Sequence, residues 1–256
     1  MMKAHPHLPP FPSRERREID LDKERVKLSF SNAAKNYDSL ATLQKEVAEG
    51  LIDFGFRISD FGLKTLNLAS APKGDPPHPS ILDIGCGTGF LTHALAEVFP
   101  QTDIFGCDIS HSMIKVASRK LQVTRDKKIH LITTDGEILP CKNETFDIVI
   151  SNVTYQWLPN LDTAFSEAHR VLRPGGIFTF STFGTETLKE LRYCYAEASA
   201  KFNKDGLPPF MGFSEKQAIQ SVLESAGFKN ISIETTKITK TYPDMWMLLK
   251  TMKSIG

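Results

Sequence analysis

The sequence predicts an α/β fold in which a mostly parallel central sheet has helices on both faces. Three observations lead to this prediction. Five short apolar runs alternate with segments of helical periodicity, a glycine-rich turn follows the first run, and an acidic residue follows the second. Strands that alternate with helices in this way form parallel sheets through right-handed crossovers.

The individual elements follow from the spacing of apolar residues. Helical spacing runs from about Lys23 to Phe56 with a break near residues 36–38, which predicts two helices. The strands are expected at 81–84, 104–107, 129–133, 146–151 and 177–181. The helices between them are expected at 90–98, 113–121 and 161–172.

The alternation of strands and helices changes after the fifth predicted strand. A long polar helix over about 185–203 indicates a helical insertion that spans about 184–213. A capping box at Ser214 would open another helix, and Gly227 would close it. A last strand is expected at 231–238 and a last helix at 245–255.

Composition divides the chain into three parts. Residues 1–22 have mixed charges and no hydrophobic period, so a disordered leader is expected there. Four prolines within residues 71–80 prevent regular structure, because proline removes a backbone donor and fixes φ. This stretch separates an N-terminal helical cap at 23–70 from a core domain at 80–256.

Charge and cysteine content exclude several classes of function. The 256 residues carry 31 Lys and Arg against 30 Asp and Glu, which argues against general nucleic-acid binding. No apolar run approaches the ~20 residues of a membrane-spanning helix. The four cysteines lie far apart with no histidine at metal-ligand spacing, so we expect reduced thiols, a cytoplasmic location and no metal site.

The strongest functional signal is the run Ile81-Leu82-Asp83-Ile84-Gly85-Cys86-Gly87-Thr88-Gly89. A buried strand ends there in a glycine turn, and a helix begins at once with free N–H groups toward the crevice beyond the strand. This arrangement predicts a cofactor that contains adenosine. A dinucleotide site prefers the spacing G-x-G-x-x-G around a pyrophosphate. Here the turn reads G-x-G-x-G behind Asp83, whose negative charge suits a cationic ligand.

Two further turns are expected at the same crevice. Asp108 follows the second strand, and its two oxygens can accept both hydroxyls of a ribose. Alternatively, Asp108 or Ser110 caps the next helix. The turn at 134–140, which contains Asp135-Gly136-Glu137, offers an acidic side chain and an amide to the edge of adenine, or is a plain surface turn.

Together these motifs resemble the class I S-adenosylmethionine-dependent methyltransferases over about residues 80–181. The resemblance implies a Rossmann-like fold with S-adenosylmethionine as methyl donor. It also implies that Asp83 lies beside the methionine part, Ile109 and Met113 against adenine, and Asn152 below the sulfonium. The residues expected to bind the cofactor are Gln44, Asp83, Gly85, Cys86, Gly87, Gly89, Asp108, Ile109, Met113, Asp135, Gly136, Glu137, Ser151 and Asn152.

The flanking segments are similar to the malonyl-acyl-carrier-protein O-methyltransferases of biotin synthesis, from about Leu28 to the last residue. This family implies methylation of the free carboxylate of a malonyl thioester on acyl carrier protein, or on coenzyme A. Its members usually continue past the Ile-Gly pair with a further helix and a final strand, whereas this sequence ends at Gly256. A monomer is expected. The motifs are Ser31-x-Ala33-Ala34-x-x-Tyr37-Asp38-x-x-Ala41-x-x-Gln44, Asn152 to Trp157, Thr187-Leu188-x-Glu190-Leu191-Arg192 and Leu248-Leu249-Lys250.

Three catalytic residues are expected on this basis. Tyr37, seven positions before Gln44, would lie on one face of a helix that closes as a lid, or would pack in the core. Trp157 would exclude water from the methyl group, or would be a core residue. Arg192 on the insertion helix is the expected cation for the malonyl carboxylate, although most arginines on polar helices are simply solvated.

Two alternative functions are also compatible with parts of the sequence. The arginine hydroxylase assembly factor of respiratory complex I has a similar Asp-Gly-Glu turn and a similar Thr-Leu-x-Glu-Leu-Arg helix. A non-catalytic subunit that binds the cofactor and docks a partner is the other alternative. Four lysines could steer an acidic carrier protein or form a solvated face, namely Lys189, Lys201, Lys204 and Lys216.

Overall fold

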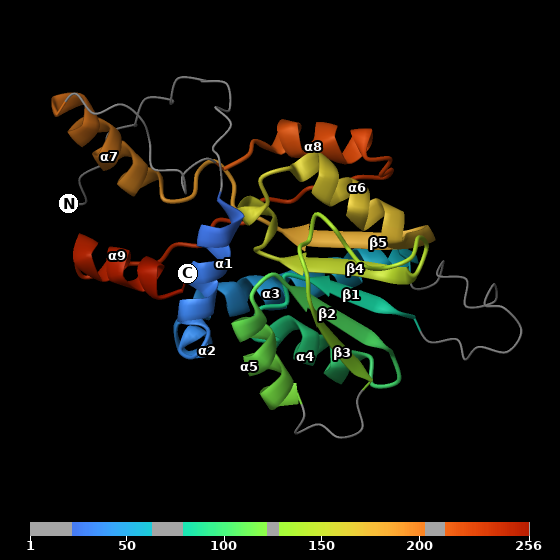
Figure 1. The fold of residues 1–256 in the computed structure, drawn as a ribbon. Helices are drawn as coiled ribbons and strands as arrows, with labels where there is room; N and C mark the ends of the chain where they lie inside the picture. The colour runs from blue at the N-terminus through green and yellow to red at the C-terminus, as the bar shows by residue number, and fades with distance from the viewer. Residues whose placement is uncertain (1–21, 63–78, 122–127, 203–212, 256) are drawn as a thin grey trace, which may run out of the picture.

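The structure is a computed structural model that describes residues 22–62, 79–121, 128–202 and 213–255 (Figure 1). The expected leader lies outside the described residues except for Asp22, as does most of the proline-rich stretch. Five parallel strands form one sheet in the order β3-β2-β1-β4-β5, which confirms the predicted fold class. The strands are β1 (Ile81–Ile84), β2 (Ile104–Asp108), β3 (Ile129–Thr133), β4 (Phe146–Asn152) and β5 (Leu172–Ser181).

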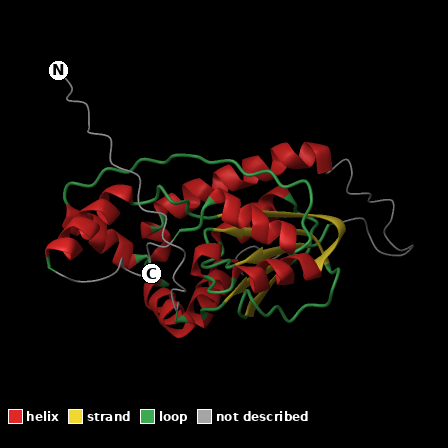
Figure 2. Ribbon diagram, turned by 90° about the horizontal axis from the view of Figure 1, so that it is seen from above, coloured by secondary structure: helices red, strands yellow, loops and turns green. Residues whose placement is uncertain are grey.

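Helices cover both faces of the sheet, and Figure 2 shows them packed along the strands. None of the helices in the described parts of the chain is long and apolar enough to cross a membrane. The helices are α1 (Lys23–Ala33), α2 (Tyr37–Leu40), α3 (Thr42–Gly62), α4 (Phe90–Val98), α5 (His111–Leu121), the 3₁₀ turn η2 (Tyr155–Trp157), α6 (Leu161–Val171), α7 (Lys189–Lys201), α8 (Lys216–Ser225) and α9 (Met245–Ser254).

The central strand β1 is buried at all four positions. Ile81 packs in a cluster with side chains of α3 and α4, while Leu82 and Ile84 pack on the other face with α6. Each fully buried Leu or Ile contributes about 2 kcal/mol of hydrophobic stabilisation. The apolar neighbours of this strand therefore keep its one polar residue, Asp83, away from water.

The N-terminal helices differ from the prediction in one respect. The chain turns at residues 34–36, and a second break at Ala41, whose φ and ψ leave the helical region, separates α2 from α3. Tyr37 and Gln44 therefore lie on different helices, so the expectation that they share one helix face is wrong. Asp22 caps α1 by accepting from the N–H groups of Glu24 and Arg25.

The C-terminal part contains three corrections. β5 begins at Leu172 rather than at 177, because its register against β4 shifts between Phe146 and Ile148 and accommodates the extra residues. The capping box at Ser214 is wrong, since the N-cap of α8 is Glu215 and makes no side-chain capping bond. Residues 231–240 form no strand, although the predicted last helix is confirmed as α9.

The alternation that suggested a strand at 231–238 has a different cause. Ile231 and Ile233 are half-buried against the cluster around α6 and α8, and Ser232 between them is exposed. Alternating burial requires only an extended chain that lies on an apolar surface. It does not require a hydrogen-bonded neighbour.

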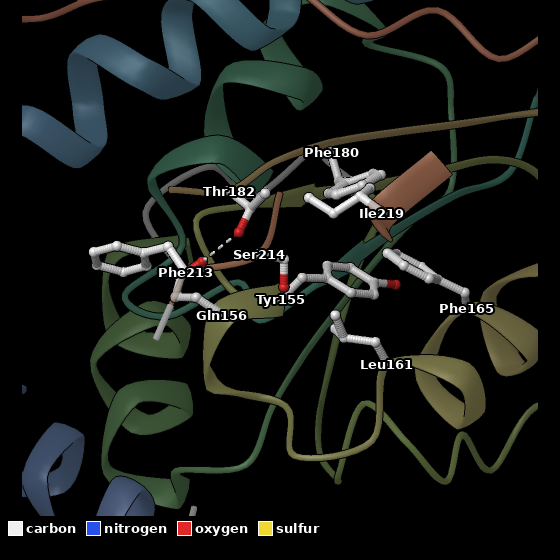
Figure 3. Close-up of a pocket in the computed structure, with 9 residues that line it drawn as sticks. All are labelled: Tyr155, Gln156, Leu161, Phe165, Phe180, Thr182, Phe213, Ser214 and Ile219. Carbon is white, nitrogen blue, oxygen red and sulfur yellow. Dashed lines mark hydrogen bonds between the residues drawn. The ribbon is translucent and has the colours of Figure 1, made fainter. Parts of the chain in front are cut away.

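A small pocket, whose empty volume of about 280 Å³ includes space open to solvent, lies where η2, α6 and α8 meet the end of β5 (Figure 3). Tyr155 is 2% exposed and stacks on Phe165 with ring centroids 4.8 Å apart. Its hydroxyl has no hydrogen-bond partner among the described residues. The lining residues are Tyr155, Gln156, Leu161, Phe165, Phe180, Thr182, Phe213, Ser214 and Ile219.

We expect Tyr155→Phe to leave the stability unchanged or to raise it. A buried polar group without a partner costs about 1–3 kcal/mol, and phenylalanine keeps the ring contacts. The free energy of unfolding, measured with urea, tests this. Tyr155→Ala is the control, and it should lose about 3 kcal/mol because it leaves a cavity. A clear loss of stability in Tyr155→Phe would mean that the hydroxyl has a partner.

Candidate active site

A cleft with an empty volume of about 450 Å³, which includes space open to solvent, lies at the carboxyl ends of β1 and β4. The strand order reverses between these two strands, and ligands of open α/β sheets bind at such a switch point. Thirteen residues line the cleft: Tyr37, Asp38, Ala41, Gln44, Lys45, Asp83, Gly85, Cys86, Gly87, Thr88, Phe90, Leu91 and Asn152.

The structure thus brings together seven of the residues predicted from sequence. They come from α2, α3, β1, the glycine turn and the end of β4. The others lie elsewhere: Gly89, Asp108, Ile109, Met113, Asp135, Gly136, Glu137, Ser151, Trp157 and Arg192 do not line the cleft.

Two buried oxygen atoms on the cleft residues lack a donor. Asp83 is 1% exposed, and its Oδ2 accepts a 2.6 Å hydrogen bond from Thr92, while its Oδ1 has no partner among the described residues. Oε1 of Gln44 is likewise buried without a partner. Burial raises the pKa of Asp83 to about 7, and the nearby Asp108 adds to this against the bond from Thr92. A bound ammonium group would satisfy both oxygens.

Asp108 serves the glycine turn from the neighbouring strand. Its Oδ2 accepts from the N–H of Gly87 at 3.0 Å, and its Oδ1 from the N–H of Ser110 at 2.8 Å. Burial raises the pKa of Asp108 to about 6, although these two bonds oppose the shift. Each carboxylate oxygen can accept a second bond, so the capping role and a ribose-binding role are compatible.

The glycine turn requires glycine at two positions for different reasons. Gly85 has a φ of 73°, and a Cβ there would lie 2.2 Å from Oγ1 of Thr154. Gly87 also has a positive φ, but a Cβ there would meet nothing within 4 Å, because this residue faces the open cleft. The first glycine lets two loops approach each other, and the second leaves main chain accessible to a ligand.

Helix α1 is held over the loops that follow β2 and β3. Lys23 pairs with Asp135 at 2.5 Å and with Glu137 at 2.6 Å, and Ser31 shares a 2.9 Å hydrogen bond with Ser110. The carboxylates of Asp135 and Glu137, both expected to bind the cofactor, are therefore paired with α1 in this structure. We call α1 and α2 together the lid (Figure 1).

The short helix α2 is held to the glycine turn through Asp38. One carboxylate oxygen accepts from Thr88 Oγ1 at 2.5 Å, and the other pairs with Lys120 of α5 at 2.6 Å. Burial raises the pKa of Asp38, but the bonds from Lys120 and Thr88 outweigh this and lower it overall. These contacts place Tyr37 at the cleft, where burial raises its pKa well above the usual value.

The residues after β4 complete the far wall. Asn152 donates to the Gln44 carbonyl at 2.9 Å and accepts from Ser181 at 2.8 Å, which fixes its amide at the cleft. Ser151 is fully buried and donates to the carbonyl of Ile84, so its role here is to join two strand ends. Trp157 packs edge-on against Phe30 of the lid, with ring centroids 5.6 Å apart.

Two cations differ from the sequence-based expectation. Arg192 lies on α7 outside the cleft, and its guanidinium donates to the carbonyl of Thr185. Lys45, which the sequence reading missed, lines the cleft instead. Its Nζ donates to the Asp38 carbonyl at 2.6 Å and lies 5.5 Å from the centre of the Phe90 ring. Lys45 is the fourth residue of α3 and belongs to no motif, so only its place beside Gln44 offered a signal.

The cleft therefore suits a ligand with separated charges. Asp83, which has an unpaired carboxylate oxygen, Gln44, which has an unpaired amide oxygen, and Lys45 all line this cleft. This pattern fits the amino acid part of S-adenosylmethionine, which carries an ammonium and a carboxylate. No group of three or more potential metal ligands occurs among the residues that the structure describes.

Comparisons with known proteins place the chain among methyltransferases. Residues 82–180 match the family described as "Methyltransferase domain". The chain is 34% identical to the malonyl-[acyl-carrier protein] O-methyltransferase of Methylococcus capsulatus over 92% of its own length and 77% of that protein. It is 33% identical to the enzyme of the same name from Geobacter sulfurreducens, over 92% of its own length and 82% of that protein.

Solved structures show the same fold. A putative sarcosine dimethylglycine methyltransferase from Galdieria sulphuraria is similar with a TM-score of 0.51 and 15% identity. The match covers 71% of this chain and 61% of that one. At this identity the likeness concerns the fold alone.

We expect the affinity for S-adenosylhomocysteine to rise with pH up to about 7 and then to level off. The carboxyl of Asp83, with a pKa of about 7 in the free protein, must ionise to attract the ligand's ammonium. Affinity should fall about tenfold per pH unit between 7 and 6, since one proton is released on binding, and more steeply below 6, where Asp108 is protonated as well. Titration calorimetry between pH 5 and 8 measures this.

Asp83→Asn is the control for this pH dependence. It should bind weakly and lose most of the dependence above pH 6, leaving only the part due to Asp108, whose pKa is about 6. The stability of the free protein should change in the opposite direction. A carboxyl with a raised pKa stabilises the fold at low pH, and this contribution is lost as the pH rises through 7. A wild-type affinity that is constant from pH 5 to 8 contradicts the assignment.

Proposed function

Since the chain belongs to the malonyl-[acyl-carrier protein] O-methyltransferase family, we propose that it methylates the free carboxylate of a malonyl thioester on acyl carrier protein. S-adenosylmethionine is the methyl donor, and the reaction is an early step of biotin synthesis. The observation that carries the proposal is the pair of unpartnered buried oxygens on Asp83 and Gln44, two residues that line the cleft at the strand switch point.

Methyl transfer to a carboxylate requires little acid–base catalysis from the protein. S-adenosylmethionine, when bound, supplies a methyl group on a sulfonium, which a carboxylate oxygen takes by in-line displacement as the carbon–sulfur bond breaks and its electrons pass to sulfur. Because a malonyl carboxylate is ionised at neutral pH, no general base has to remove a proton. The protein must align the two reactants and exclude water. Tyr37 and Asn152 line the cleft for this purpose, and we assign the exclusion of water to Trp157, which packs on Phe30 of the lid.

The reaction involves two carboxylates, one on the donor and one on the substrate. We assign Lys45 to the donor carboxylate, because it lines the cleft together with Asp83. We assign Arg192 to the malonyl carboxylate. Its helix follows β5, and Ser181 at the end of β5 donates to Asn152 beside the cleft. We further propose that the enzyme acts as a cytoplasmic monomer, in which its four free cysteines stay reduced.

Incubation of the purified protein with methyl-labelled S-adenosylmethionine and malonyl-acyl carrier protein should place base-labile label on the carrier. A methyl ester is cleaved by mild base, whereas methylated nitrogen is not. The unmalonylated carrier is the control and should remain unlabelled. Absence of label from the malonyl carrier, in protein that binds S-adenosylhomocysteine, would refute the substrate assignment.

The roles of the two cations can be separated. We expect Lys45→Met to weaken S-adenosylmethionine binding about tenfold, the size of a charge-assisted hydrogen bond. Binding of decarboxylated S-adenosylmethionine, which keeps the ammonium, should hardly change. Titration calorimetry with both ligands measures the difference, and Lys27→Met on the exposed side of α1 is the matched control. An equal loss for both ligands would contradict the assignment.

For Arg192, we expect Arg192→Ala to lower kcat/KM for the malonyl thioester far more than it lowers cofactor affinity. The guanidinium acts on the substrate carboxylate in our assignment, so the donor site should stay intact. Steady-state kinetics with varied malonyl-acyl carrier protein, together with calorimetry, gives both quantities. Arg192→Lys should recover part of the rate. Equal losses of rate and of cofactor affinity would indicate that Arg192 only supports the fold.

A further inference from the structure

Helix α9 presents an exposed face that the site described above does not use. Trp246 is 75% exposed, the highest value for a large apolar side chain among the described residues. Lys250 and Lys253 lie four and seven positions after it, so the three side chains share one face of the helix. Both lysines are exposed. The side chains of Leu248 and Leu249 are half-buried by comparison.

The net charge on this face is positive. The nearest acidic residue along the chain is Asp244, and its carboxylate accepts from the N–H of Met247 at 2.8 Å as the cap of the helix. The preceding segment contributes Lys240, which pairs with Glu46 of α3 at 2.5 Å. An indole flanked by two lysines suits a partner surface that combines acidic side chains with an apolar spot. We call Trp246, Lys250 and Lys253 the α9 face.

The α9 face lies next to the lid. α9 packs against α2, the helix that carries Tyr37 and Asp38 of the cleft. The ion pair between Lys240 and Glu46 joins the segment before α9 to α3, which carries Gln44 and Lys45. Figure 1 shows α9 beside the lid. A protein bound there could deliver a flexible arm to the cleft.

We propose that the α9 face docks the acyl carrier protein during methyl transfer. The inference rests on the proposed function, because that function makes an acidic carrier protein the bearer of the substrate. The lysines meet acidic side chains of the carrier, and Trp246 packs on an apolar spot between them. The lysines suggested by the sequence are less suitable. Of the three that the structure describes, Lys189 and Lys201 lie on α7 and Lys216 on α8, and Lys189 and Lys216 are bonded to Glu186 and to the Ile233 carbonyl.

The test compares two substrates that carry the same malonyl group. For malonyl-acyl carrier protein, Trp246→Ala and the double variant Lys250→Glu/Lys253→Glu should each raise KM about tenfold with little change in kcat. For malonyl-coenzyme A, which lacks the carrier surface, the same variants should behave like the wild type. Lys189→Glu/Lys201→Glu on α7 is the charge-matched control and should change neither.

A binding measurement makes the result independent of turnover. Malonyl-acyl carrier protein should shift the fluorescence of Trp246 to the blue as the indole leaves water. Trp246→Phe, which retains Trp157, should lose that shift, and malonyl-coenzyme A should not cause it.

If the wild-type protein methylates neither malonyl-acyl carrier protein nor malonyl-coenzyme A, the proposed function itself is refuted.

Three outcomes would overturn the docking proposal while leaving the function intact. One is an unchanged KM for the carrier substrate in the α9 variants. Another is a loss in the α7 control instead. The third is an effect of Trp246→Ala on sedimentation alone, which would mean that the face binds a second copy of this chain.

Discussion

The buried carboxylate of Asp83 is the constraint on which the rest of the site depends. It lies in the central strand, between apolar clusters on both faces of the sheet, where an unpaired charge is costly. The protein supplies one hydrogen bond, from Thr92, and leaves the second oxygen without a donor. A ligand with an ammonium group supplies the missing partner. The ionised carboxylate of Asp83 thus lowers the folding stability of the free protein at neutral pH, and binding of such a ligand would restore that stability.

Hydrogen bonds and ion pairs from several elements position the segments around Asp83. Asp108 holds the glycine turn from the neighbouring strand, and Asn152 fixes the backbone of Gln44 from the other side. The lid closes the space through Asp38 and Lys23, which bond to the loops after β1 and β3. The loops after β1 and β3 are therefore positioned by side chains from other elements, which helps residues distant in sequence to converge on one cleft.

Sequence reasoning predicted the sheet well, because its strands are apolar runs bounded by turn residues. The bounds of β1, β3 and α4 agree with the prediction. The site was predicted less completely. Lys45 and Lys23 carry no motif, since their roles depend on how the lid folds back onto the core. Arg192 was expected at the cleft, but the orientation of an inserted helix is not encoded in its periodicity. At 231–238, the alternation of apolar and polar residues reflects burial of one side of an extended chain and not hydrogen-bonded pairing with another strand.

The attachments between lid and core have a consequence for the end of the catalytic cycle. They include the ion pairs of Lys23 and Lys120 and the hydrogen bonds of Ser31 and Thr88, which water can replace one at a time. Such polar contacts can break one after another with a low barrier, whereas an apolar interface between lid and core would have to separate all at once. Departure of the spent donor can then proceed through partial fraying of the lid, and its rate should increase with ionic strength.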